Sequence, residues 1–216
     1  MRYKISGNEL RTENAAKPHT QQSKHVASYL NSIEMVDSLL DFGCGKLRYS
    51  DILTRISKRT TFVDSEIQLS RTQVVRGVKT TVNNYVRSNY ENSIAISFES
   101  IKKHKEEYDL ITCTNVLSAI PCDKTLKSAL GEMRRLLKEK GTIIFINQHK
   151  SSYFKKYETG QRHMHGYLYN GRKGTSYYGI LCKRKTTVLL KENGFKVKKS
   201  WCKGESNYIE ATTICS

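Results

Sequence analysis

The chain has little acidic charge and lacks several features that would assign it to other protein classes. No apolar stretch approaches the roughly 20 residues that a membrane helix needs. The first ten residues are polar, unlike a signal peptide. None of the six cysteines forms a Cys-x-x-Cys pair, which argues against a zinc ribbon or a thioredoxin motif. These absences predict a soluble, cytoplasmic protein with no metal site and no membrane contact.

The charge balance is strongly basic. The chain carries 37 Lys and Arg against 20 Asp and Glu, a formal net charge of +17. Such an excess favours a polyanionic partner, with nucleic acid ahead of an anionic membrane surface. The alternative is a solvated basic surface without a partner.

The 216 residues suit one α/β domain. Residues 1–18 are polar and end in Lys17-Pro18, and we interpret them as a basic N-terminal arm of low order before a domain over 19–216. Strands are predicted at 38–42, 60–63, 93–98, 108–114 and 142–147, and helices at 20–31, 47–57, 67–76, 124–138 and 184–192. Residues 77–90 show no clear pattern.

Strands that alternate with helices predict a parallel sheet covered on both faces. The last two predicted strands, 195–201 and 208–215, have only a short polar connection, which favours an antiparallel hairpin. The expected fold is therefore α/β and Rossmann-like: a doubly wound, mostly parallel seven-stranded sheet with a C-terminal antiparallel hairpin.

The strongest motif is Asp41-Phe42-Gly43-Cys44-Gly45, between a predicted strand and a predicted helix. Its glycines let the backbone turn sharply and approach a ligand, and the following helix start aims free amides at that ligand. The third glycine of a dinucleotide site is missing, which counts against NAD. Asp64 ends the next predicted strand, where an acidic side chain can accept both hydroxyls of a ribose.

These motifs resemble those of the class I S-adenosylmethionine-dependent methyltransferases, and the resemblance runs from about Thr20 to the C-terminus. Residues 41–45 are similar to the family's first motif, 61–64 to the second and 108–117 to the fourth. The resemblance implies S-adenosyl-L-methionine as cofactor. It implies cofactor-binding residues in the loop, after the second and third strands and after the fourth: Asp41, Gly43, Cys44, Gly45, Asp64, Ser65, Glu99, Asn115 and Val116.

The sequence departs from the family at two places. The family often has an acid beside the adenine, where Ser97, Glu99 and Ser100 are the candidates. The first motif frequently carries one more glycine where this chain has Leu47, so Arg48 and Tyr49 are expected unusually close to the cofactor.

The acceptor of the methyl group is less evident. After the fourth strand the chain reads Thr-Asn-Val-Leu over 114–117, which lacks the Asp/Asn-Pro-Pro-Tyr/Phe signature of DNA amino-methyltransferases. Pro121-Cys122 comes too late to be a cytosine C5 nucleophile and is interpreted as a helix cap. Methyl transfer needs mainly alignment and exclusion of water, so few side chains are obligatory.

An insert over about 148–182 is expected on the acceptor side of the sheet. From 148 to 184, six tyrosines alternate with lysines and arginines, a pattern that favours base stacking and phosphate contacts. The candidates for a catalytic role there are His149, Tyr153 and Tyr178. A nucleic-acid acceptor is slightly favoured; the alternatives are a small-molecule acceptor in a tyrosine-lined pocket, or a methyltransferase-like module that binds without catalysis.

Overall fold

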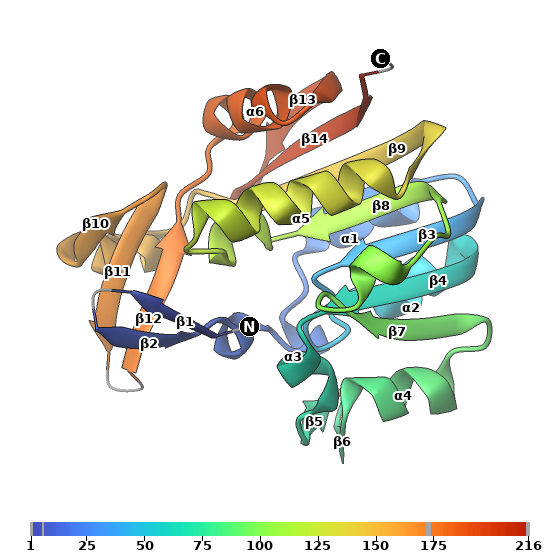
Figure 1. Cartoon of the computed structure of the whole chain (residues 1–216), viewed down its shortest axis with the longest axis horizontal. Coiled ribbons are helices and arrows are strands. Elements are labelled where there is room, and N and C mark those ends of the chain that lie inside the picture. Colours follow the sequence, from blue (N-terminus) through green and yellow to red (C-terminus); the bar gives the residue numbers. More distant parts are fainter. Residues whose placement is uncertain (1, 6, 172–173, 215–216) are drawn as a thin grey trace.

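The computed structural model describes residues 2–5, 7–171 and 174–214, apart from the side chains of residues 152 and 153. Its centre is a seven-stranded sheet in the order β13-β14-β9-β8-β3-β4-β7 (Figure 1). In that order the strands are β13 (Phe195–Lys203), β14 (Ser206–Thr213), β9 (Leu137–Gln148), β8 (Tyr108–Thr114), β3 (Val36–Phe42), β4 (Ser57–Asp64) and β7 (Ser93–Ser97).

The pairing confirms the expected fold class. The five strands β9, β8, β3, β4 and β7 run parallel, whereas β13 and β14 form an antiparallel hairpin and β14 pairs antiparallel with β9. The strand order reverses direction next to β3, because β4 and β8 lie on its two sides. Ligands of open α/β sheets bind at the carboxyl ends of the strands at such a point.

Helices cover both faces of the sheet. They are α1 (Lys24–Asn31), α2 (Ser50–Arg55), α3 (Glu66–Ser70), α4 (Val82–Asn89), α5 (Asp123–Arg135) and α6 (Lys183–Glu192). Successive residues of β3 point to opposite faces, so Leu40 packs in the core under α5 and α6 while Leu39 packs in the core under α1 and α2. Among the described residues, no helix is long and apolar enough to cross a membrane.

The structure shows a hairpin at the start of the segment in which the sequence has no clear pattern, residues 77–90. The helix expected over 67–76 ends at Ser70, and a short hairpin follows, formed by β5 (Gln73–Val75) and β6 (Val78–Thr80). Its two turn residues, Arg76 and Gly77, both have positive φ, +49° and +89°. Two such residues are what a tight hairpin turn requires, and an arginine there gives little sequence signal.

The expected insert forms a small antiparallel sheet of its own. After the 3-10 segment η5 (Ser152–Thr159) come β10 (Gln161–His163), β11 (Gly166–Gly171) and β12 (Gly174–Gly179), in the order β10-β11-β12. This sheet lies beyond the carboxyl ends of the central strands, at the left in Figure 1.

The N-terminal residues differ from the expected arm of low order. They form a hairpin of β1 (Arg2–Ile5) and β2 (Asn8–Arg11), followed by two 3-10 turns, η1 (Thr12–Ala15) and η2 (His19–Gln21). The hairpin packs against β12 (Figure 1). Leu10 is fully buried there with Leu168 and Tyr177, and the partly buried Tyr3 and Ile5 of the same hairpin pack against this cluster.

The buried Leu10 makes a stability test of the arm. Leu10→Ala should lower the free energy of unfolding by about 2–4 kcal/mol, because it leaves a cavity between the hairpin and the insert. Lys4→Ala, on the exposed side of the same hairpin, should change it by less than about 0.5 kcal/mol. Urea unfolding of both variants measures the difference. An unchanged midpoint for Leu10→Ala would show that the arm does not fold with the domain.

Candidate functional site

The loop after β3 is held open by backbone hydrogen bonds to the end of β4. The amides of Gly43 and Cys44 both donate to the carbonyl oxygen of Val63, over 2.7 and 2.9 Å. Gly43 and Gly45 have φ values of +82° and +56°, which glycine adopts without strain. A Cβ on Gly43 would lie 2.2 Å from a methyl carbon of Val116. This glycine is therefore required both by its backbone angle and by the space beside it.

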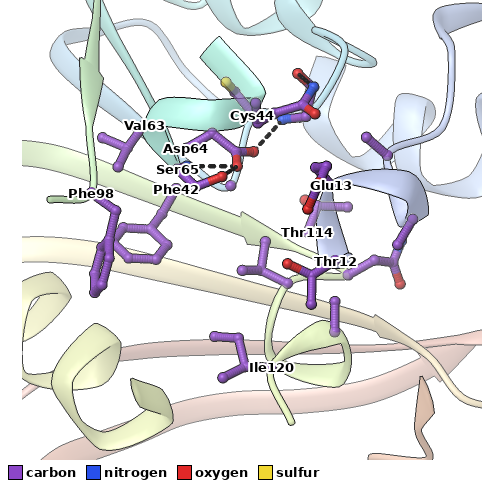
Figure 2. Close-up of a pocket in the computed structure, with 18 of the residues that line it drawn as sticks. Thr12, Glu13, Phe42, Cys44, Val63, Asp64, Ser65, Phe98, Thr114 and Ile120 are labelled. Atoms are coloured by element: carbon purple, nitrogen blue, oxygen red, sulfur yellow. Dashed lines mark hydrogen bonds between the residues drawn. The ribbon is translucent and has the colours of Figure 1, made fainter. Parts of the chain in front are cut away.

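Asp64 connects the same loop to the end of β4. Its Oδ2 accepts a hydrogen bond from the amide of Gly45 over 2.9 Å, and its Oδ1 accepts one from the amide of Ser65 over 2.7 Å (Figure 2). The hydroxyl of Ser65 also donates to Oδ1, over 3.4 Å, so it is Oδ2 that keeps a second lone pair for a ligand. Burial raises the pKa of Asp64 above its usual range.

A cavity of about 170 Å³, partly open to solvent, lies over this loop. Its walls come from the ends of β3, β4 and β8, from the start of α5 and from the N-terminal arm. Eight of the expected site residues line it: Asp41, Gly43, Cys44, Gly45, Asp64, Ser65, Asn115 and Val116.

Glu99 is an expected site residue that lies elsewhere. Its Oε2 accepts a hydrogen bond from the amide of Glu66, over 2.9 Å, at the start of α3. Its neighbour Phe98 lines the cavity instead, because the amide of Phe98 donates to the carbonyl oxygen of Asp64 and holds that residue at the pocket wall. Figure 2 shows Phe98 beside Phe42 at one end of the cavity.

Two of the three catalytic candidates from the sequence, His149 and Tyr178, lie outside this cavity. The Nδ1 atom of His149 is 3.1 Å from the side-chain nitrogen of Asn207, beside β14. The hydroxyl of Tyr178 donates to the carbonyl oxygen of Gln148 over 2.8 Å, and the ring of Tyr178 stacks on Phe154. Neither His149 nor Tyr178 lines the cavity. The side chain of Tyr153 lies outside the described part of the chain.

The arm supplies cavity-lining residues that sequence analysis did not identify. They come from β1, η1 and the residues just after η1: Tyr3, Thr12, Glu13, Ala15, Ala16 and Lys17. A Cβ on Gly45 would lie 3.3 Å from the Cβ of Ala16, so the arm passes directly over the glycine loop. No periodic pattern marks these residues, and only the buried Leu10 could have indicated that the arm folds back. Arg48 and Tyr49 also line the cavity, as their position next to the motif predicted.

Asp41 lies at the bottom of the cavity, where burial raises its pKa to about 7. Its Oδ1 accepts a hydrogen bond from the hydroxyl of Thr112, which is paired with it across β3 and β8. This bond favours the ionised form but does not offset the desolvation. Asp41 therefore titrates near neutral pH in the folded protein.

The raised pKa of Asp41 predicts a pH dependence of stability. In the unfolded chain an aspartate titrates near about pH 3.9, so between about pH 4 and 7 the folded protein holds a proton that the unfolded chain has lost. The contribution of Asp41 to the free energy of unfolding must therefore fall as pH rises through this window. Asp41→Asn should show a smaller decline than wild type in urea unfolding between pH 4 and 7. Parallel profiles would contradict the prediction.

Leu47 occupies a position where the family frequently has glycine, and its φ is indeed in the left-handed region, at +57°. This conformation costs a side-chain-bearing residue roughly 1–2 kcal/mol. The side chain is fully buried against Cys44, Phe62 and Leu69, which offsets the strain.

At Leu47, glycine should therefore destabilise the protein less than alanine does, which is the reverse of the usual order in a helix. Leu47→Ala loses the buried side chain and keeps the strain, at a cost of about 2–5 kcal/mol. Leu47→Gly relieves the strain and should be about 1 kcal/mol less destabilising than Leu47→Ala. At Leu53, buried on α2, glycine should instead be about 1 kcal/mol worse than alanine. Urea unfolding of the four variants compares the two sites, and the same order at both would exclude strain at Leu47.

Comparison with known proteins agrees with the fold and the cavity described above. A family model described as a methyltransferase domain matches residues 10–199. The uncharacterized protein YmfD of Escherichia coli (strain K12) is 46% identical over 209 residues, covering 97% of this chain and 95% of YmfD.

Solved structures share the fold at low sequence identity. A S-adenosylmethionine-dependent methyltransferase from Clostridium acetobutylicum ATCC 824 has a TM-score of 0.62 at 15% identity, covering 90% of this chain and 93% of that one. The N-methyltransferase NodS from Bradyrhizobium japonicum WM9, in complex with S-adenosyl-L-homocysteine, has a TM-score of 0.57 at 14% identity, covering 94% and 88%. This chain has the fold of S-adenosylmethionine-dependent methyltransferases and belongs to the methyltransferase-domain family.

Proposed function

We propose that the protein transfers a methyl group from S-adenosyl-L-methionine to a small-molecule acceptor. The observation that carries this proposal is the N-terminal arm, which covers the cofactor loop and supplies one wall of the cavity. A cavity closed in this way suits a ligand that is mostly surrounded by protein. A duplex or a structured RNA would have to displace the arm.

The residues of the cavity fit the cofactor. Gly43 and Gly45 carry no Cβ that would fill the space over the loop. Asp64 lies at the end of β4, where the remaining lone pair of its Oδ2 is available to a hydroxyl of a ribose. Phe98 offers an apolar surface at one end of the cavity, next to Phe42. The structural relative NodS is in complex with S-adenosyl-L-homocysteine, which agrees with this use of the site.

The opposite wall suits a compact acceptor. Ile120, Ala119 and Ala129 provide small apolar surfaces there, and Thr12 and Thr125 provide hydroxyls. When bound, S-adenosyl-L-methionine supplies a methyl group on its sulfonium, and this group passes directly to the nucleophile of the acceptor as the carbon–sulfur bond breaks. The protein's own contribution is to align the acceptor and exclude water, and the arm and Ile120 are placed to do both.

The tyrosines of the insert are poorly placed for base stacking. Tyr178 stacks on Phe154 with ring centroids 4.2 Å apart, and Tyr157 lies against both Tyr178 and Tyr169. Tyr177 is buried against Leu10. Each of these rings already contacts a neighbouring side chain, which leaves less of its surface for stacking on nucleotides.

Nucleic acid stays the second candidate because the cations of the same region are exposed. They include Lys155, Lys156, Arg162, Lys183 and Arg184. Such a surface favours phosphate contacts without base stacking.

Methyl transfer from labelled cofactor tests the proposal. The protein is incubated with methyl-labelled S-adenosyl-L-methionine and either the small-molecule fraction of a cell extract or purified total RNA and DNA. We expect label in the small-molecule fraction only. Label on RNA or DNA, with binding that weakens steeply as salt rises, would overturn the acceptor assignment in favour of nucleic acid.

Asp64→Asn is the matched loss-of-binding variant, because it keeps the shape of the side chain but removes its charge and one of the two oxygens that accept from the amides of Gly45 and Ser65. It should weaken cofactor binding at least tenfold, or about 1.4 kcal/mol, and lower the labelling accordingly. Cofactor binding by wild type without transfer to any fraction would instead support a non-catalytic binding module.

A further inference from the structure

The charged side chains that line the cavity are unevenly distributed. In the view of Figure 2, Asp64 lies between Phe98 on one side and Glu13 on the other. Arg48 follows the glycine loop in the chain and also lines the cavity. A ligand with its base beside Phe98 and its sugar at Asp64 therefore extends toward Glu13 and Arg48.

Arg48 has a donor without a partner. Its Nη2 donates to the carbonyl oxygen of Gln21, and its guanidinium carbon lies 5.2 Å from the ring centre of Tyr49. Its Nε is buried and has no hydrogen-bond partner among the described residues. Burial also lowers the pKa of Arg48. A buried guanidinium N–H without an acceptor is costly, and an anion in the cavity would satisfy it.

Glu13 places a carboxylate in the same region from the arm. Its side chain is only 2% exposed and lines the cavity, although it belongs to the short turn η1. Arg2 Nε lies 3.3 Å from its Oε1, and Arg71 Nη2 donates to its backbone carbonyl over 2.7 Å. The contact with Arg2 lies within the arm, and the contact with Arg71 holds Glu13 against the domain. A buried carboxylate facing a cavity favours a cationic ligand group.

We infer that Arg48 and Glu13 bind the two charges at the amino-acid end of S-adenosyl-L-methionine, Arg48 the carboxylate and Glu13 the ammonium. The inference rests on the proposed function and goes beyond it, because it assigns cofactor recognition to a residue of the N-terminal arm. A zwitterion is recognised by a cation at its carboxylate and an anion at its ammonium, and Arg48 and Glu13 both line the cavity. Cofactor binding then holds the arm closed over the acceptor.

The other charged residues that line the cavity are Asp41, Asp64, Lys17 and Lys46. Asp41 lies on the floor of the cavity, where its Oδ1 is occupied by Thr112. Lys17 and Lys46 have flexible side chains, whereas the guanidinium of Arg48 is fixed by Gln21 and Tyr49. Arg48 is therefore the better organised anion site.

Calorimetric titration with two ligands tests the inference. S-adenosyl-L-homocysteine carries the amino-acid end, and 5′-methylthioadenosine lacks it. Arg48→Gln and Glu13→Gln should each weaken S-adenosyl-L-homocysteine at least tenfold and change the affinity for 5′-methylthioadenosine less than twofold. Arg55→Gln and Glu34→Gln, two exposed positions outside the cavity, are matched controls and should change neither affinity.

A third ligand separates the two roles. Decarboxylated S-adenosyl-L-methionine keeps the ammonium and lacks the carboxylate. Its affinity should fall with Glu13→Gln and stay the same with Arg48→Gln. The same loss for all three ligands in a variant would indicate a structural role and overturn the assignment.

The outcome for wild type separates this inference from the proposed function. If neither S-adenosyl-L-homocysteine nor 5′-methylthioadenosine binds, the cofactor assignment itself fails. If both bind equally well, the cofactor assignment stands and the amino-acid end is not held, which overturns the inference. Hydrogen exchange gives a second readout: S-adenosyl-L-homocysteine should protect the amides of residues 8–16 in wild type and not in Glu13→Gln.

Discussion

The hydrogen bond from the amide of Gly45 to the carboxylate of Asp64 is the interaction on which the site depends. It connects the loop after β3 to the end of β4, two neighbouring parallel strands. The glycine loop is fixed further by the carbonyl of Val63 and by Gln68, whose Nε2 donates to the carbonyl oxygen of Gly45 over 2.7 Å. The same carboxylate is the ribose-binding group of the proposed function, so one side chain both shapes the loop and faces the ligand. Its burial and its bonds to two amides keep it in one position.

The central sheet and the cofactor loop could be predicted from the sequence because their signals are local. Buried parallel strands appear as apolar runs, and Asp41 to Gly45 and Asp64 each follow directly after such a run. Gly43 is needed because its φ is positive and because Val116 leaves no space for a Cβ. Of these two requirements, a glycine in the sequence indicates only the first. The residues after β8 line the cavity for the same reason, since the chain leaves the sheet there.

The remaining parts of the site depend on contacts between distant segments, which no local pattern reports. Glu13 reaches the cavity because Leu10 packs on the insert more than 150 residues later in the chain. Tyr178 was expected near the acceptor because aromatic and basic residues alternate, but its ring is used to stack on Phe154. Glu99 and Phe98 differ by one position, and only the hydrogen bond of Phe98 to Asp64 decides which of them lines the cavity. In these cases the position of the side chain is determined by tertiary contacts.

The contact of β2 with β12 also has a consequence for the order of folding. The segment that closes the cavity is synthesised before its binding surface on the insert, which lies more than 150 residues later in the chain. A contact with so large a sequence separation carries a high entropic cost of loop closure and forms late. During synthesis the nascent protein therefore exposes its glycine loop until the insert has left the ribosome. Closure of the cavity over the cofactor is a late step of folding, because it must wait for the insert.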